Sequence, residues 1–579
     1  MKPDAFRNQV ILALVLVVAG LIAWRLFILS YVRHTVYSKT AQAQNENIAN
    51  VLIRGNIYLQ DPKAAGSSDT ANYTVATDKK FPLVYAVPEL VADPAAAAHQ
   101  LHTILNIDEQ SVLATLATKT PTTKIIASKI STDAVKEIGD LNMKGIGIRY
   151  EMDRYYPAGI LAANVLGFFG FDDQGRSGQY GVEAYFDNEL SGAADTSSRS
   201  LPAVKPANLL DSLKNFFSSG SVREASAPRP ADIILTIDRN IQSFAEAKLD
   251  EVLKKWSASG GTIIVQDPQT GKILAMADRP SFDPNSYSIS SAGSYLNRSV
   301  EEVFEPGSSF KPITMAAGLD TGKVTPDTTY TDPGTINIAG YQIHNFDQQA
   351  HGTVSMTTVL EKSLNTGAAF VENLLGQDTF LNYVINFGLG QKTGIDLPGE
   401  VNGDVSNLYS GRQINFVTAS FGQGIAVTPL QLINAYSAIA NGGKLMKPYV
   451  VDHISYEDGH SDTTQPEVVS IPITPKTSQK LRSMLVSVVD HGFDKARITG
   501  YDVAGKTGTA QIPSSGGGYE EGTFIHDFLG FAPASDPKFV VLIKMDRPKG
   551  ITFAADSLSP VFRDVAQYII NYYNIPPTR

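Results

Sequence analysis

The sequence predicts an α+β fold, in which an antiparallel five-stranded sheet is flanked by helices and joined to an all-helical subdomain. Apolar residues recur at helical spacing over 238–256 and again after Ser559. Between these two helices the chain has five short segments with strand composition. A long helical stretch separates the first two strands from the last three, so both ends of the domain are expected to contribute to one sheet.

The elements of this domain are predicted in a simple order. They are the helix 238–256, the strands 261–265 and 272–277, a helical middle, the strands 506–511, 528–531 and 539–545, and a final helix. Asp267-Pro268-Gln269-Thr270-Gly271 predicts the tight turn between the first two strands. The final helix is predicted to begin with Ser559 as its N-cap and Pro560 at its first position.

Three short motifs occur in one order within this domain: Ser308-Ser309-Phe310-Lys311, Ser363-Leu364-Asn365 and Lys506-Thr507-Gly508. The first follows a Pro-Gly turn and opens a helical pattern, so Ser308 lies where free N–H groups and the positive end of the dipole gather. Lys311 follows one turn later and can accept the serine proton if burial and a second cation lower its pKa. The set is typical of the acyl-transfer site of penicillin-recognising serine enzymes.

Two further segments match the first and third motifs, but their sequence context argues against a role in the site. Ser535-Asp536-Pro537-Lys538 contains an Asp-Pro pair and predicts a turn between strands rather than a helix start. Lys392-Thr393-Gly394 lies in a glycine-rich loop, whereas Lys506 lies on a predicted strand that is followed by the flexible loop 513–518. Strand context therefore selects Lys506.

Composition excludes several classes of function. A chain of 579 residues is long enough for several domains, and a formal net charge of −10 argues against a general nucleic-acid binder. The absence of cysteine excludes disulfides, a cysteine nucleophile and cysteine metal ligands, and the nine histidines show no metal-ligand spacing. We therefore expect no metal and no cofactor.

An apolar run near the N-terminus predicts a membrane anchor. Residues 10–32 are long enough to span a bilayer and follow the short segment 1–9. A cleaved signal peptide with Ala41-Gln42-Ala43 as its cleavage site is the competing interpretation, but that site lies too far beyond the apolar core. Basic residues are balanced on the two sides of the run, so charge does not decide its orientation.

The chain resembles a class B penicillin-binding protein, the monofunctional peptidoglycan D,D-transpeptidase. Beyond the three motifs, the resemblance rests on four further blocks, which are Arg54-Gly55-Asn56-Ile57-Tyr58, the stretch 154–167, Gly178-Gln179-Tyr180-Gly181-Val182-Glu183 and Gly422-Gln423-Gly424 with 427–432. Leu59-Gln60-Asp61-Pro62 departs from the family's usual turn, and the linker is longer than is usual. The predicted organisation is a cytoplasmic segment 1–9, an anchor 10–32, a stalk 33–50, an α/β pedestal of the dimerisation type 51–190, a linker 191–230 and a transpeptidase domain 231–579.

The resemblance implies a role for each motif residue. Ser308 is the acylated nucleophile, Lys311 is its base, and Ser363 relays a proton to the leaving amine with Lys506 nearby. Asn365 hydrogen-bonds the substrate amide and Lys311. The strand Thr507, Gly508 and Thr509 binds the substrate, its two threonines hold the terminal carboxylate, and the N–H groups of Thr509 and Ser308 form the oxyanion hole.

The implied substrate is a peptidoglycan stem peptide ending in D-Ala-D-Ala. Its last D-Ala is released, and the acyl group passes to an amine on a neighbouring stem. β-Lactams inhibit the enzyme covalently. This chemistry lies outside the cytoplasmic membrane, which places the N-terminus inside. The sequence blocks resemble the division or sporulation branch, and the implied partners are a polytopic SEDS-type membrane glycosyltransferase and other divisome proteins.

Three alternative functions share these motifs. A D,D-carboxypeptidase or β-lactamase needs a placed base for deacylation by water, and no clear glutamate-containing loop for it stands between Asn365 and Lys506. A β-lactam receptor usually has extra cytoplasmic machinery, whereas about nine residues precede the predicted anchor. A non-catalytic scaffold is disfavoured because all three motifs are intact.

Overall fold

The computed structural model describes residues 24, 54–62, 71–172, 175–192, 230–492, 494–514 and 516–579. Except for Trp24, the predicted segments 1–9, 10–32 and 33–50 lie outside these residues, as does most of the predicted linker 191–230. Among the described residues, no helix has the length and apolar character needed to cross a membrane.

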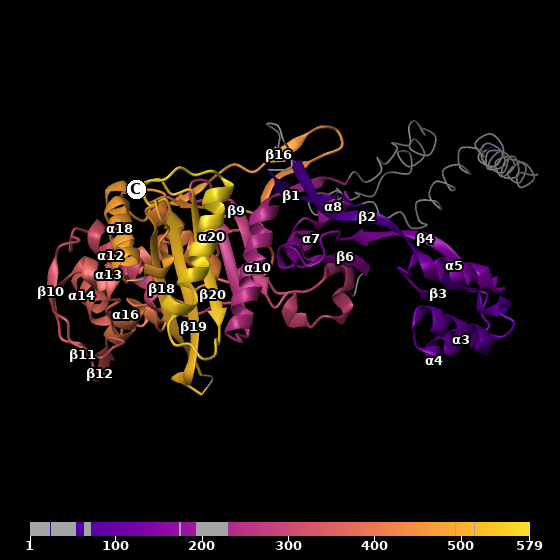
Figure 1. Cartoon of the computed structure of the whole chain (residues 1–579), viewed down its shortest axis with the longest axis horizontal. Coiled ribbons are helices and arrows are strands. Elements are labelled where there is room, and N and C mark those ends of the chain that lie inside the picture. Colours follow the sequence, from indigo (N-terminus) through magenta and orange to yellow (C-terminus); the bar gives the residue numbers. More distant parts are fainter. Residues whose placement is uncertain are drawn as a thin grey trace, which may run out of the picture. The chain divides into compact units, whose positions relative to one another are not determined.

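The C-terminal part of the chain is built on a five-stranded antiparallel sheet, as predicted (Figure 1). Its strands, in spatial order, are β18 (Ala504–Pro513), β19 (Tyr519–Ala532), β20 (Phe539–Asp546), β8 (Gly260–Gln266) and β9 (Ile273–Arg279). Strand β19 is much longer than the predicted segment 528–531, because its first half pairs with the end of β18 in a hairpin. The rejected Ser535-Asp536-Pro537-Lys538 pattern lies in the turn between β19 and β20.

Two terminal helices cover one face of this sheet, α10 (Arg239–Lys255) and α20 (Ser559–Tyr572) (Figure 1). They pack side by side, and the rings of Phe244 and Tyr568 stack with their centroids 4.0 Å apart. Their apolar faces share one buried core with alternate residues of the central strands. Asp238 caps α10 by accepting hydrogen bonds from the N–H groups of Asn240 and Ile241.

The prediction that Ser559 caps the final helix is wrong. Helix α20 begins at Ser559 itself, and Leu558 precedes it with helical backbone angles. The short helix α19 (Ala554–Ser557) runs directly into this start, so the Leu558 carbonyl accepts the first helical bond, from Phe562 N. An N-cap needs an extended residue at this position, and the preceding helical turn excludes it.

The helical subdomain packs on the other face of the sheet. It comprises a short 3-10 turn η6 (Gly307–Phe310), α12 (Lys311–Asp320), α13 (Met356–Glu361), α14 (Asn365–Leu375), α15 (Gln377–Asn386), α16 (Gln413–Ala419), α17 (Pro429–Ala440) and α18 (Pro475–Ser487). Every residue of α17 is buried, which makes this helix the centre of the core. Its start is fixed by a capping box between Thr428 and Gln431.

Several smaller strands lie around the five-stranded sheet and the helical subdomain. The helical subdomain has two hairpins, β10 (Thr329–Asp332) with β13 (Gly352–Ser355) and β11 (Thr335–Ile338) with β12 (Tyr341–His344). Strand β7 (Asp232–Asp238) pairs with β1 (Ile57–Asp61) and with β15 (Val451–Ser455), which pairs with β16 (Ser461–Thr463). Strand β1 also pairs with the first part of β2 (Ala71–Ala86).

The described chain divides into two compact units. One contains 54–77 and 155–579, and the described part of the other is 78–154. The smaller unit contains the second part of β2, α3 (Pro94–Leu105), α4 (Glu109–Ala117), β3 (Lys124–Ala127), α5 (Thr132–Leu141) and most of β4 (Ile146–Tyr155). It has its own apolar core. The domain boundaries at 51–190 and 231–579 stay predictions.

A buried ion pair joins three of the sequence blocks in the larger unit. Arg54 Nε lies 2.7 Å from Glu183 Oε2, and its guanidinium also contacts Asp187 at 2.7 Å. The hydroxyl of Tyr156 donates to Glu183 Oε1 at 3.1 Å. The side chains of Arg54 and Glu183 are at most 1% exposed. These long-range bonds hold the segment at 54–56 against α7 (Gly181–Tyr185).

Replacing Glu183 tests this buried pair. Glu183→Gln is expected to lower the free energy of unfolding by about 3 kcal/mol, because it leaves the buried Arg54 guanidinium without its main counter-charge. Urea unfolding followed by circular dichroism measures the loss. Glu520→Gln is the control, since its partner Arg547 is exposed and that pair is expected to contribute little. Equal midpoints for the two variants would contradict the prediction.

Candidate active site

The turn that carries Ser308 is packed tightly between glycines. Gly307 has a left-handed φ of +58°, and its N–H donates to the Gly422 carbonyl at 2.9 Å. A Cβ on Gly422 would lie 2.1 Å from the Gly307 carbonyl oxygen, so this position excludes every larger residue. The turn runs directly into α12 at Lys311. Ser308 therefore lies just before the helix start, close to where the sequence predicted it.

Lys311 lies within hydrogen-bond distance of both motif serines. Its Nζ is 2.9 Å from Ser308 Oγ, 3.1 Å from Ser363 Oγ and 2.6 Å from the Ser363 carbonyl oxygen. The side chain is almost completely buried. Burial lowers the pKa of Lys311 well below its usual value, and the positive charge of Lys506 lowers it further. A neutral amine beside a serine hydroxyl can act as a base.

Lys506 approaches the same serine hydroxyl from the sheet. Its Nζ lies 3.0 Å from Ser363 Oγ and 3.1 Å from the Thr507 carbonyl oxygen. Burial lowers the pKa of Lys506 to about 7, and the negative charge of Asp527 opposes this shift. Ser363 has a left-handed φ of +56°, which is unfavourable for a serine and points to a locally strained position. The Ser363 hydroxyl thus lies between two lysine amines.

Asn365 makes a different contact from the one that the resemblance implies. Its Nδ2 donates to the His344 carbonyl at 2.8 Å, and it makes no hydrogen bond to Lys311 among the described residues. Asn365 is the first residue of α14 and still lines the cavity. The hairpin β11–β12 therefore holds the amide in place in this structure.

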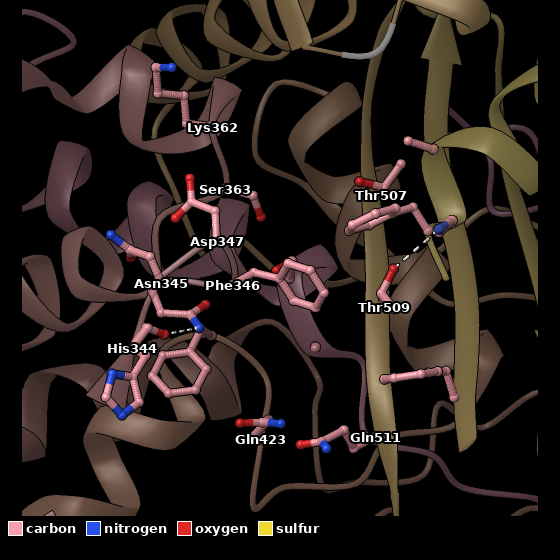
Figure 2. A pocket seen from close by; sticks show the side chains of 18 of the residues that line it. His344, Asn345, Phe346, Asp347, Lys362, Ser363, Gln423, Thr507, Thr509 and Gln511 are labelled. Atoms are coloured by element: carbon pink, nitrogen blue, oxygen red, sulfur yellow. Dashed lines mark hydrogen bonds between the residues drawn. The ribbon is translucent and has the colours of Figure 1, made fainter. Parts of the chain in front are cut away.

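The substrate strand forms one wall of a cavity of about 650 Å³. Figure 2 shows Thr507 and Thr509 on this wall and Ser363 and Phe346 on the opposite side. The Thr509 hydroxyl oxygen accepts a hydrogen bond from the Ala554 N–H at 3.2 Å. A Cβ on Gly508 would lie 2.6 Å from the Pro306 carbonyl oxygen, so glycine lets the strand approach the nucleophile turn.

The second Lys-Thr-Gly segment lies elsewhere. The N–H and hydroxyl of Thr393 both donate to Glu400 Oε1, at 2.6 and 2.5 Å, within a loop. None of Lys392, Thr393 and Gly394 lines the cavity at Ser308. The structure therefore brings together Ser308, Lys311, Ser363, Asn365 and Lys506–Thr509, and leaves Lys392 apart.

Sequence reasoning missed one wall of the cavity. The segment 344–347, at the end of β12 and just beyond it, lines the cavity with His344, Asn345, Phe346 and Asp347 (Figure 2). A buried carboxylate, Asp332, organises this wall, because it accepts hydrogen bonds from the side chains of Asn345, Thr366 and His351. No sequence motif marks these residues, although Asp-Pro-Gly at 332–334 indicates a turn.

The described residues contain no cluster of histidine, aspartate and glutamate that could hold a metal ion.

Comparison with known proteins identifies two matching families. The penicillin binding protein transpeptidase domain matches residues 261–567, and the penicillin-binding protein dimerisation domain matches residues 53–205. Stage V sporulation protein D of Bacillus subtilis (strain 168) is 33% identical over 530 residues, which cover 90% of this chain and 80% of that protein. A peptidoglycan D,D-transpeptidase FtsI homolog of Mesostigma viride is 28% identical over 509 residues, 83% of each chain.

A solved structure supports the same assignment. Penicillin binding protein 3 from Mycobacterium tuberculosis, complexed with ampicillin, is 29% identical with a TM-score of 0.65, and the match covers 74% of this chain and 91% of that chain. The two family matches, the sporulation relative and this structure agree with the three motifs that meet in the cavity. The chain belongs to the penicillin-binding protein transpeptidase family.

Proposed function

We propose that this chain is a peptidoglycan D,D-transpeptidase that cross-links stem peptides through a serine acyl-enzyme. The observation that carries the proposal is the buried Lys311 amine at 2.9 Å from Ser308 Oγ. Burial favours the neutral amine, which can take the serine proton. Two relatives, a peptidoglycan D,D-transpeptidase homolog and a penicillin-binding protein in complex with ampicillin, support the same reaction.

In the first half-reaction, Ser308 Oγ attacks the carbonyl carbon of the penultimate D-Ala while its proton passes to Lys311. The resulting oxyanion is stabilised by the N–H groups of Ser308 and Thr509. The C–N bond then breaks, and the departing D-Ala amine takes its proton from Ser363, which Lys311 replenishes. The Ser363 hydroxyl lies within 3.1 Å of both lysine amines, so this relay needs no large movement.

In the second half-reaction, an amine of a neighbouring stem attacks the ester carbon. The same groups act in reverse: the amine loses a proton through Ser363 to Lys311, and Ser308 leaves with that proton. The new amide is the cross-link, and the enzyme returns to its starting state.

The strand β18 is proposed to hold the substrate carboxylate. Lys506 supplies positive charge, and the hydroxyls of Thr507 and Thr509 supply donors. Because the Thr509 oxygen already accepts the Ala554 N–H, its own proton stays available for the carboxylate. Gly508 keeps the strand close to the Ser308 turn. Asn365 is proposed to bind the substrate amide, after exchanging its present contact with His344.

The cellular setting is proposed from the resemblance and from the names of the relatives. An anchor at 10–32 would hold the catalytic domain outside the cytoplasmic membrane with the N-terminus inside. A SEDS-type membrane glycosyltransferase and other divisome proteins would be its partners. The similarity to a stage V sporulation protein and to an FtsI homolog favours a role in sporulation or division.

Penicillin labelling tests the proposed reaction. The full chain in detergent is expected to gain one penicilloyl adduct on the peptide that carries Ser308, and Ser308→Ala is expected to gain none. Intact-mass measurement followed by peptide mapping gives the answer. The adduct is expected to persist for minutes to hours, because the three motifs contain no carboxylate that could activate water. Rapid hydrolysis of penicillin would instead favour the β-lactamase or carboxypeptidase alternative.

The role of the base is tested by a substitution that keeps the positive charge. Lys311→Arg is expected to lower the acylation rate by about three orders of magnitude or more, because arginine cannot be neutral at accessible pH and nucleophile activation fails. The rate of labelling by a fluorescent penicillin measures the effect. Lys362→Arg, at an exposed lysine directly before the Ser363 motif, is the control. A near-normal rate in the Lys311 variant would show that another group is the base.

Substitutions in the two Lys-Thr-Gly segments are expected to have different effects on acylation. Lys506→Ala is expected to slow acylation and to move the acid limb of its pH profile to higher pH. The sign follows because the Lys506 charge lowers the pKa of Lys311, so its removal lets Lys311 hold a proton at higher pH. Lys392→Ala is expected to change neither quantity. An equal defect in the two variants would overturn the choice of Lys506.

A further inference from the structure

One row of directly paired residues crosses the five-stranded sheet, starting on the substrate strand β18 and ending on β9. Its members, from β18 to β9, are Gly508, Asp527, Lys544, Thr262 and Asp278. Directly paired residues of antiparallel strands project from the same face, so their side chains are neighbours. The four side chains are at most 4% exposed. Each buried polar side chain of this row needs a partner or a function.

At the β9 end of the row, the buried polar groups have hydrogen-bond or ion-pair partners. Asp278 accepts hydrogen bonds from Thr262 Oγ1 at 2.5 Å and from Ser299 Oγ at 3.1 Å. Lys544 pairs with Asp546 and lies 5.3 Å from the centre of the Phe304 ring. These contacts explain why Asp278 and Lys544 can be buried, and they indicate a structural role for both residues.

The near end is different. Asp527 is completely buried, and neither of its carboxylate oxygens accepts a hydrogen bond of normal geometry from the described residues. The Ser309 hydroxyl and the Gly508 N–H both lie beside the carboxylate, and the Ser309 hydroxyl donates to the Pro306 carbonyl at 2.8 Å. A buried carboxylate without such bonds is costly, and it is retained only where its charge interacts with a nearby cation or serves a function.

The Asp527 carboxylate lies against the catalytic strand. A Cβ built on Gly508 would lie 2.3 Å from Asp527 Oδ2 and 2.6 Å from the Pro306 carbonyl oxygen. The carboxylate is therefore packed on the backbone that joins Lys506 to Thr509, directly behind the turn of the nucleophile. It does not line the substrate cavity.

The charged and titratable groups that face Asp527 come from three elements. They are Lys506 on β18, two residues before the Gly508 that pairs with Asp527, then Lys544 on β20, which pairs with Asp527 directly, and Tyr436 on α17. Helices α19 and α20 pack on the opposite face of β19, where His526 contacts Ser557. Lys311 on α12 faces Lys506 from the other side. Burial raises the pKa of Asp527 to about 7, and the two lysine charges oppose this rise.

The two catalytic lysines have opposite requirements. Lys311 must be neutral to accept the Ser308 proton, whereas Lys506 must be charged to attract a carboxylate and to keep Lys311 neutral. Burial by itself favours the neutral form of both. A negative charge near Lys506 and farther from Lys311 would distinguish the two amines.

We propose that Asp527 is a positioning residue that keeps Lys506 protonated, so that the single proton shared by the two lysines stays on Lys506 and Lys311 remains the base. Asp527 acts through Lys506 and touches no reacting atom. This inference rests on the proposed transpeptidase function and adds to it a residue outside the three motifs.

The isosteric variant Asp527→Asn tests the proposal. The second-order rate of acylation by a fluorescent penicillin is measured against pH for the full chain in detergent. Removing the negative charge makes the lysine pair release its proton more easily, so the alkaline limb is expected to move to lower pH by about one unit. The maximal rate is expected to fall, because part of the shared proton moves to Lys311.

A matched control is available at the other end of the same row. Asp278→Asn removes an equally buried carboxylate and is expected to lower the unfolding midpoint while leaving the pH limbs where they are. Asp527→Ser is measured in the same way if the asparagine variant does not fold. Circular dichroism verifies folding of each variant.

The possible outcomes separate the two proposals. If wild-type protein is not acylated at Ser308, the proposed function is wrong and this inference is wrong with it. If wild-type protein is acylated but a folded Asp527 variant keeps the wild-type pH limbs, only this inference is wrong. If neither Asp527 variant folds, Asp527 is a structural residue and the inference is overturned.

Discussion

Two buried lysine amines within hydrogen-bond distance of one serine hydroxyl set the requirements for the rest of this site. Lys311 and Lys506 each lie about 3 Å from Ser363 Oγ. Two ammonium groups so close together and out of water would repel strongly, so at most one can keep its proton. This constraint produces both the base and the cation that the proposed reaction needs. It also explains why the motif residues must come from different layers of the fold.

The sheet and the helical subdomain meet this requirement by approaching very closely. Gly422 contacts the backbone of Gly307, and Gly508 lets β18 pass the Pro306 carbonyl. Beneath the turn, the Tyr436 hydroxyl donates to the Ser309 carbonyl at 2.7 Å and connects it to the most deeply buried helix. A side chain at Gly508 would separate the two layers, and one at Gly422 would displace the turn that carries Ser308. The lysines would then be reached by water, and the lowered pKa of Lys311 would be lost.

A second buried carboxylate shapes the opposite wall. Asp332 binds the side chains of Asn345, Thr366 and His351, which come from separate elements. Thr366 directly follows Asn365, so the same hydrogen bonds fix the start of α14 and the segment after β12. Asp332 supports the wall through complete hydrogen bonding, whereas Asp527 acts by charge. Polar networks of the first kind give a unique geometry to a cavity wall.

Local sequence pattern was sufficient for most features that depend on neighbouring residues in the chain. Residues 308 and 311 are one helical turn apart, so the serine and its base meet through backbone geometry alone. Alternation and turn residues predicted the strands, and strand context separated Lys506 from Lys392. At Ser559 this local logic failed, because α19 continues into α20 and the preceding residue is already helical.

Tertiary structure alone decided the remaining features. The left-handed Ser363, the Asn365 bond to His344 and the buried ion pair of Arg54 with Glu183 all join segments that lie far apart in the chain or depend on such contacts. The burial of Asp527 follows from the register of β19 with β18, which no residue of β19 specifies by itself. The sequence by itself predicted which groups would do the proposed chemistry. Their charges depend on burial and on neighbours from other elements, and the packed structure creates both.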